Sequence, residues 1–338
     1  MRINRSTLLK IAQDTVAQRT RSDRTINAAY LCGSLLGEDY LLGGAADIDL
    51  VFIYIEKPEN EREIVRLTDE VHLDIAHHYR KDYQQTRALR VHPWLGPTLC
   101  ECKALYDPQH FLDFTQASVR GQFYQAEYVL ERSRRGAEHA RQIWQGYALD
   151  LPDPGPQEFW RYLRAVEHAT NAVASLNGPP LTDRRMMLYY PERAEKAGRP
   201  GLPAALAGLL GGANAERETL QAWLPRWAET YAAAAAAADP AQLGRISPHR
   251  VGYYQRAFQA ILQREQAAAV LWPLLRTWTE AAMLLPESAP EREFWVEAGL
   301  ALGLLGPAFE ERVAALDAYL DQIEETLENW AYANGAVY

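Results

Sequence analysis

Cysteine is scarce in this chain, which has only three among its 338 residues. Cys32, Cys100 and Cys102 fall in segments that we predict to be strands, and they have no partners at the spacing of a metal site. Their odd number argues against a disulfide framework. We therefore expect a protein of the reducing cytoplasm.

Long apolar runs are also lacking. No window approaches the roughly 20 apolar residues that a membrane-spanning helix needs. Residues 1–6 lead into a polar helix, which is unlike the uninterrupted apolar segment of a secretory leader. We expect a soluble protein with no membrane partner.

Positive charge is in short supply, and the formal net charge is −9. Residues 1–112 hold 14 basic and 16 acidic side chains, and residues 113–338 hold 21 and 28. Binding to duplex DNA or tRNA normally requires a positive face that displaces phosphate counterions, so no nucleic-acid partner is expected. The acidic surplus of the second part favours a small cationic molecule instead.

The composition is otherwise that of an ordinary globular protein, with 48% hydrophobic and 23% charged residues. The length suffices for two domains that each bury a core of their own. A single small module is therefore excluded.

The most informative segment is a Gly-Ser pair followed by two acids on one predicted strand. Gly33 has no Cβ to obstruct a phosphate, and Ser34 adds a hydroxyl donor at the start of a short helix. Residues 47–53 read Asp-Ile-Asp-Leu-Val-Phe-Ile, and successive side chains of a strand point to opposite faces. Asp47 and Asp49 therefore share one face, opposite an apolar one. Adjacent carboxylates repel each other, and a divalent cation is a common reason for such an arrangement.

A third acid, Asp74, lies in a second alternating segment, residues 71–78. If this strand pairs beside the first, Asp74 completes a triad of carboxylates. Three acids suit two Mg²⁺ ions about 3.5–4 Å apart. His77 and His78 are adjacent on the strand and face opposite ways, so we do not expect them to chelate one ion.

With these residues the sequence resembles the nucleotidyltransferase superfamily that includes DNA polymerase beta. The shared signature is a hydrophobic-Gly-Ser turn, an Asp-hydrophobic-Asp strand and a later strand Asp, here Gly33-Ser34, Asp47, Asp49 and Asp74. The resemblance covers roughly the first hundred residues. Within the superfamily, the chain most resembles the kanamycin-type and streptomycin-type antibiotic nucleotidyltransferases. It implies an α/β nucleotidyltransferase core, a mixed sheet with flanking helices, over residues 1–112. An all-α helical-bundle domain that binds the acceptor is implied over residues 113–338.

The resemblance also implies an activity. A nucleoside monophosphate, AMP from ATP or the equivalent from another nucleoside triphosphate, is transferred to a hydroxyl of a small, aminoglycoside-like acceptor, with release of pyrophosphate. Asp47 and Asp49 would bind both Mg²⁺ ions, Asp74 would bind the catalytic one and help to activate the acceptor, and Gly33 with Ser34 would hold the β and γ phosphates. Two alternatives stay open: a regulatory enzyme that transfers AMP to a protein side chain, and a catalytically silent binding module of the same fold.

One departure concerns the charge of the triphosphate. Family members often carry a basic residue just after the Gly-Ser pair, whereas this chain has no Lys or Arg between Arg24 and Lys57. The phosphate charge would then be met by Mg²⁺ and by basic side chains from elsewhere. The candidates are Arg80, Lys81, Arg87 and Arg90.

Apolar periodicity and breakers predict the remaining elements of the first hundred residues. We expect a helix over Ser6–Arg19 capped by Ser6 or Thr7, a strand over Ala28–Cys32, a short helix or an ordered connection over Glu61–Glu70, and a last strand over Leu99–Leu105.

From Ala117 the pattern becomes helical. We expect one long helix from Ala117 to the prolines at 152–156, further helices over 157–177 and 215–238, and one from Ser247 to about Leu285, kinked or broken near Pro273. The apolar stripe of a last helix, from Phe309 to Trp330, fits a bundle seam or a homodimer contact, and we favour the bundle seam.

A polar stripe on the helix over 157–177 contains Trp160, Arg164, Glu167 and Asn171. In the antibiotic-modifying relatives a glutamate of the helical domain can serve as general base. Glu167 is therefore our candidate for the base or for an acceptor contact, and Glu127 is a second one. A solvated helix face is the alternative for such a stripe.

Overall fold

The computed structural model describes residues 3–239 and 246–336. Contacts divide the chain into two compact units. The first comprises Met1–Tyr128 and Gly252–Ala257, and the second comprises Val129–Val251 and Phe258–Tyr338.

The first unit is built on a five-stranded mixed sheet of order β3-β4-β2-β1-β5. Strands β2 and β4 run parallel, and the other neighbouring pairs are antiparallel. The strands are β1 Ile26–Cys32, β2 Ala46–Tyr54, β3 Arg62–Arg66, β4 Val71–Tyr79 and β5 Lys103–Tyr106. The predicted strands around Ala28–Cys32, 47–53 and 71–78 are confirmed.

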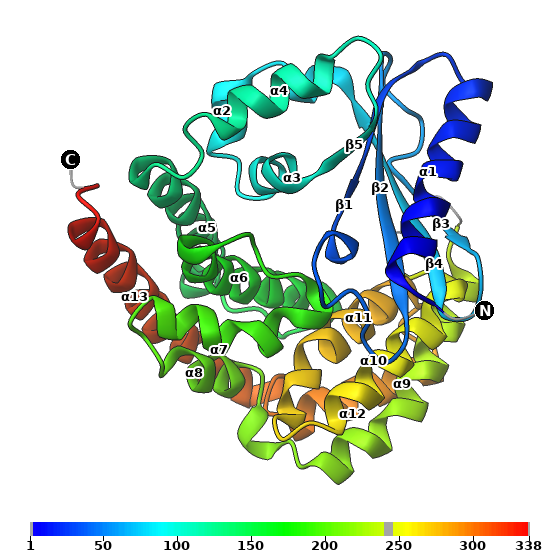
Figure 1. The fold of residues 1–338 in the computed structure, drawn as a ribbon. Coiled ribbons are helices and arrows are strands. Elements are labelled where there is room, and N and C mark those ends of the chain that lie inside the picture. Colours follow the sequence, from blue (N-terminus) through cyan, green and yellow to red (C-terminus); the bar gives the residue numbers. More distant parts are fainter. Residues whose placement is uncertain (1–2, 240–245, 337–338) are drawn as a thin grey trace. The chain divides into compact units, whose positions relative to one another are not determined.

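Helices cover both faces of this sheet, so that α1 lies against one face and α2, α3 and α4 lie on the other (Figure 1). They are α1 Arg5–Ser22, α2 Thr86–Arg90, α3 Leu95–Glu101 and α4 Phe111–Arg120. Ile48 and Leu50 of β2 pack in the same core as Leu8 of α1. Val51, of opposite parity, packs with Leu99 of α3 in the second core. The two acids of β2 have the parity of Val51 and therefore belong to the face of α2, α3 and α4.

Three local expectations for this unit were wrong. Helix α1 is capped by Asn4, whose side chain accepts from the backbone N–H of Thr7 at 2.9 Å. Within 61–70 the chain forms the edge strand β3, because β4 offers it a ladder of backbone hydrogen bonds. Only the end of the expected strand Leu99–Leu105 is extended, since Leu99 and Cys100 lie in α3, where both side chains are buried.

The second unit is helical throughout its regular structure (Figure 1). Its α-helices are α5 Ala126–Leu149, which begins in the first unit, α6 Pro156–Ala174, α7 Met186–Lys196, α8 Leu202–Leu209, α9 Arg217–Ala237, α10 Val251–Leu262, whose residues Gly252–Ala257 belong to the first unit, α11 Leu271–Leu284, α12 Pro290–Ala301 and α13 Phe309–Ala333. Short 3₁₀ turns over both units are η1 Ser34–Leu36, η2 Arg80–Tyr83, η3 Ser175–Asn177, η4 Asp183–Arg185, η5 Gly212–Asn214, η6 Pro248–Arg250, η7 Ala267–Val270 and η8 Gly306–Ala308.

Two expected helices are divided. The helix expected from Ala117 is interrupted between α4 and α5, where Phe123 turns into the core beneath the sheet. The helix expected from Ser247 to Leu285 ends at Leu262, and a new helix begins at Leu271. The break therefore precedes Pro273, which lies in the first turn of α11, where proline is tolerated.

The stripe of α13 packs inside its own unit. Phe309, Leu316 and Ile323 are at most 1% exposed, as expected of a bundle seam. Large aromatic side chains, among them Trp227 and Tyr319, fill the same unit. Among the described residues, no helix combines the length and the apolar character needed to cross a bilayer.

We expected the division of the chain to follow residue 112. In the structure the first unit continues to Tyr128, because Leu112, Val119 and Phe123 complete the core on one face of the sheet. A distant segment, Gly252–Ala257, also belongs to this unit. There Arg256 pairs with Glu70 at 3.0 Å.

Candidate metal centre

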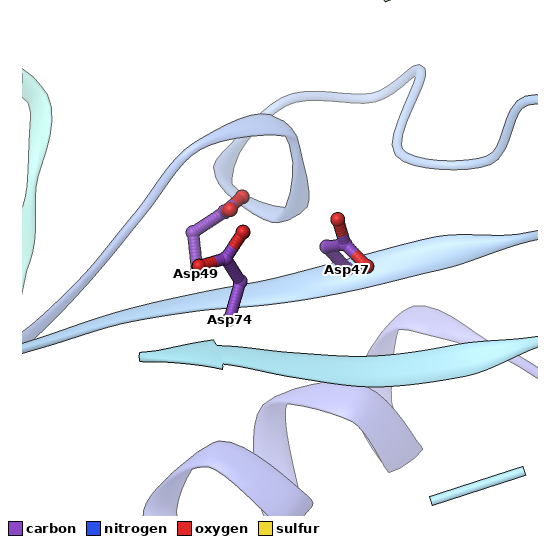
Figure 2. Close-up of side chains that lie close together, drawn as sticks. All are labelled: Asp47, Asp49 and Asp74. Atoms are coloured by element: carbon purple, nitrogen blue, oxygen red, sulfur yellow. The ribbon is translucent and has the colours of Figure 1, made fainter. Parts of the chain in front are cut away.

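Strand register brings two of the predicted acids side by side. In the parallel pair β2–β4, Asp49 lies opposite Asp74, and Asp47 lies opposite His72. One oxygen from each of Asp47, Asp49 and Asp74 lies within 4.8 Å of the others. Figure 2 shows the three carboxylates pointing to the same side of the paired strands. The condition stated for a triad, that the second strand pairs beside the first, is thus met.

The burial and the donor atoms of this triad can be compared with those of a cation site. Asp47 and Asp74 are each 5% exposed, and Asp49 is partly exposed. Carboxylates this close disfavour one another in the ionised state unless positive charge compensates them. Oxygen ligands from several carboxylates are what Mg²⁺ and Ca²⁺ prefer. The donor set and its spacing therefore fit a hard divalent cation.

The Gly-Ser turn is joined directly to the triad. Cys32, the last residue of β1, pairs with Asp49, and the turn follows at once. Gly33 has a backbone φ of 74°, and a Cβ built there would lie 1.9 Å from Oδ2 of Asp49. Ser34 begins the predicted short helix, the 3₁₀ turn η1, in which the N–H of Leu36 donates to Gly33 O at 3.2 Å. Glycine is thus required at position 33 by the carboxylate as well as by the backbone.

Arg62 of β3 also belongs to this site, although it was not predicted from the sequence. Its Nε donates to Oδ1 of Asp74 at 2.6 Å, and its Nη2 donates to Oδ2 of the same carboxylate. The arginine side chain is 35% exposed, whereas that of Asp74 is 5% exposed. Alternation along an edge strand would have placed Arg62 on the acid face, had residues 61–70 been predicted as a strand.

His72 and Cys32 form the surroundings of the triad. His72 is fully buried, with Nδ1 3.9 Å from Oδ1 of Asp47, and its ring meets that of Tyr253 edge to face. Burial, followed by the charge of Asp49, raises the pKa of the Cys32 thiol well above its usual range. The thiol is therefore neutral at physiological pH, and its soft sulfur does not match a hard cation such as Mg²⁺.

The predicted triphosphate ligands have other contacts. The Arg80 guanidinium lies 4.8 Å from the ring centre of Phe111, and the Lys81 ammonium 5.4 Å from that of Tyr79. Arg90 donates from Nε to the backbone oxygen of Ser118 at 2.9 Å. The fourth candidate, Arg87, is exposed on α2.

His77 and His78 do face opposite ways, as expected. His77 Nδ1 lies 3.0 Å from the hydroxyl of Tyr54, whereas His78 Nδ1 lies 2.5 Å from that of Tyr83. The hydroxyls of Tyr83 and Tyr30 are 3.0 Å apart. These histidines serve two separate hydrogen-bonded groups.

Glu167 lies in the second unit, on α6, where it is part of a buried ionic cluster. Its Oε1 is 2.7 Å from Nη1 of Arg276, and its Oε2 is 3.5 Å from Nη1 of Arg164. Arg276 is itself 3% exposed and lies 4.9 Å from the ring centre of Trp160. Glu127, the second candidate, is exposed in the first turn of α5. A role of either glutamate as acceptor contact or base stays a prediction.

No protein-family model matches this chain, and no curated protein sequence matches it either. Any assignment of function therefore depends on the residues of the site.

Proposed function

We propose that the chain is a Mg²⁺-dependent nucleotidyltransferase of the polymerase beta-like superfamily. It would transfer a nucleoside monophosphate, AMP from ATP, to a hydroxyl of a small-molecule acceptor. The observation that carries the proposal is the register of β2 and β4, which sets Asp49 beside Asp74 with Asp47 on the same face. The mixed sheet, the flanking helices and the helical second unit are compatible with it.

The three carboxylates would divide the metal-binding work. Asp47 and Asp49 would hold both ions, and Asp74 would hold the one beside the acceptor. Bound Mg²⁺ supplies charge neutralisation of the triphosphate and acidifies the acceptor hydroxyl.

The Gly33-Ser34 turn would receive the β and γ phosphates. The absent Cβ and the positive φ of Gly33 leave backbone groups open to a close approach, and Ser34 contributes a hydroxyl donor. The acceptor oxygen forms a bond to the α phosphorus, while the bond from that phosphorus to the bridging oxygen of the β phosphate breaks. Pyrophosphate leaves with the bonding electrons, and the acceptor proton passes to a carboxylate or water at the site.

Charge supports the proposed class of acceptor. Residues 113–338 carry 28 acidic and 21 basic side chains, so a cationic, aminoglycoside-like acceptor fits this part better than an anionic one. The same balance disfavours a nucleic-acid acceptor.

Calorimetric titration with ATP, with and without Mg²⁺, tests the proposal, and the other nucleoside triphosphates establish base preference. Mg²⁺-dependent binding that Asp49→Asn abolishes is the expected result. Asp14→Asn, which changes an exposed acid on α1, is the matched control and should bind as the wild type does. Absence of nucleotide binding under all conditions would favour a silent module and overturn the proposal.

A further inference from the structure

Arg62 and Asp74 form a two-pronged ion pair whose partners differ greatly in exposure. Nε and Nη2 of the guanidinium each donate to a different oxygen of the carboxylate. Asp74 lies in β4 with a neighbouring strand on each side, whereas Arg62 projects from the edge strand β3 and is 35% exposed. The arginine thus has room to leave, and the aspartate does not.

The position of Arg62 on β3 explains how its side chain contacts Asp74. Ile64 pairs with Asp74, and Arg62 pairs with Ala76, so the three strand residues Arg62, Ile64 and Asp74 share a face. The Arg62 side chain must therefore extend diagonally across the strand pair, toward Ile64, to reach the Asp74 carboxylate. Such a contact comes from the charge at the triad, since an exposed arginine has no packing reason to point there.

Through its contact with Asp74, Arg62 compensates part of the negative charge of the triad. Three carboxylate oxygens lie within 4.8 Å of one another, and a guanidinium fork on one of them favours its ionised form. A divalent cation bound by the same carboxylates would bring like charge close to the guanidinium. Metal and arginine therefore compete for Asp74.

The turn that would take the triphosphate is contacted by Arg5 of α1, but this guanidinium is engaged by backbone oxygens, those of Leu35 at 3.1 Å and Leu36 at 2.6 Å. No Lys or Arg occurs between Arg24 and Lys57. Arginine suits phosphate as well as carboxylate, because its planar fork matches both geometries. Of the other charged residues of β3, Arg66 pairs with Asp69, and Glu63 pairs with Arg19 and His77.

We infer that Arg62 exchanges one anion for another: it holds Asp74 while the triad is without metal and transfers to the triphosphate when metal and nucleotide are bound. This inference rests on the proposed function and adds a basic ligand for the phosphates to it. Arg62 is thus a counterion in one state and a substrate contact in the other. A purely structural ion pair would do neither.

The test compares two binding measurements on one variant. Arg62→Gln retains a polar side chain and removes the charge. We expect it to bind Mn²⁺ alone about tenfold more tightly, and the Mg²⁺ complex of α,β-methylene-ATP about tenfold more weakly, since a charged hydrogen-bonded contact is worth about that factor. Arg62→Lys, which keeps the charge without the fork, should fall between Arg62→Gln and the wild type in both titrations.

Arg66→Gln is the matched control, because Arg66 lies on the same strand and pairs with an exposed carboxylate. It should change neither affinity. Thermal unfolding in EDTA shows whether each variant folds. Weaker binding of both ligands by Arg62→Gln, or no change in either, would overturn the exchange while leaving the proposed function intact. A wild type that binds neither Mn²⁺ nor the analogue would overturn both.

Discussion

Gly33 lies so close to the Asp49 carboxylate that a Cβ on residue 33 would be 1.9 Å from Oδ2 of Asp49. Gly33 follows the end of β1, Asp49 lies in β2, and the two meet because Cys32 pairs with Asp49. The turn and the carboxylate are therefore a single geometric unit, and a change in one displaces the other.

Gly33→Ala should abolish metal binding, since the methyl group displaces the Asp49 carboxylate. It also loses about 1–3 kcal/mol from the backbone alone, because a φ of 74° with a ψ of −162° is essentially restricted to glycine. Gly44→Ala separates the two effects, because Gly44 has a similar φ of 75° and a Cβ there would have nothing within 4 Å. Mn²⁺ titration and thermal unfolding should show that Gly44→Ala is destabilised yet binds metal. Equal affinities in the two variants would contradict the steric argument.

Asp74→Asn and Asp49→Asn should differ in their effect on the metal-free protein. Asp74→Asn deprives Arg62 of its carboxylate partner, and we expect the free energy of unfolding to fall by about 1–2 kcal/mol. Asp49→Asn removes one of three like charges and leaves the ion pair intact, so stability should be unchanged or higher. Urea denaturation in EDTA gives both values. A larger loss in Asp49→Asn would show that repulsion does not govern this site.

Glu63 should make the first unit sensitive to acid. The imidazole of His77, whose Nε2 lies 3.8 Å from Oε2 of Glu63, and then the guanidinium of Arg19, which donates to Oε1, lower the pKa of Glu63 from its ordinary 4.5 to about 2. Because the folded state holds the proton less tightly than the unfolded state, this stabilisation is complete above pH 4.5 and disappears as the pH falls toward 2. In Glu63→Gln the stability should depend less on pH between 4.5 and 2. The exposed Glu59→Gln is the control and should retain the dependence of the wild type.

His168 should also make the stability of the second unit fall with decreasing pH, over a higher pH range than Glu63. Burial, and then the charge of Arg164, lower its pKa from 6.5 to about 3. Its Nε2 accepts from Nη2 of Arg164 at 3.1 Å, which requires the neutral ring. The unfolded state takes up the proton first, so stability falls as the pH drops from 6.5 toward 3. Denaturation of His168→Gln should show a flatter profile over this range, whereas His110→Gln, at an exposed site, should not.

Regular alternation made most of the site predictable. The segments around Asp47 and Asp74 alternate strictly, so their faces followed from the sequence, and their pairing followed from the resemblance. Arg62 escaped prediction because β3 is an edge strand with charged residues at 62, 63 and 66, and it is extended only because β4 pairs with it. The break between α4 and α5 escaped for a related reason: the apolar spacing continues through Phe123, whose burial under the sheet is a tertiary contact.

Substitution of Glu167 distinguishes a catalytic from a structural role of this residue. The carboxylate is 2.7 Å from Arg276, a side chain that is 3% exposed, so the pair lies out of water. Breaking a buried ion pair from one side costs up to about 3–5 kcal/mol, although Asp183 and Glu280 also lie near this arginine, 3.3 and 3.8 Å away, and reduce the loss. Glu167→Gln should therefore be destabilised by about 1–3 kcal/mol, as measured by urea denaturation. The exposed Glu192→Gln on α7 should not be. If Glu167 is instead the general base, the variant should lose turnover at unchanged stability, which would assign the glutamate to the acceptor and not to the core of the second unit.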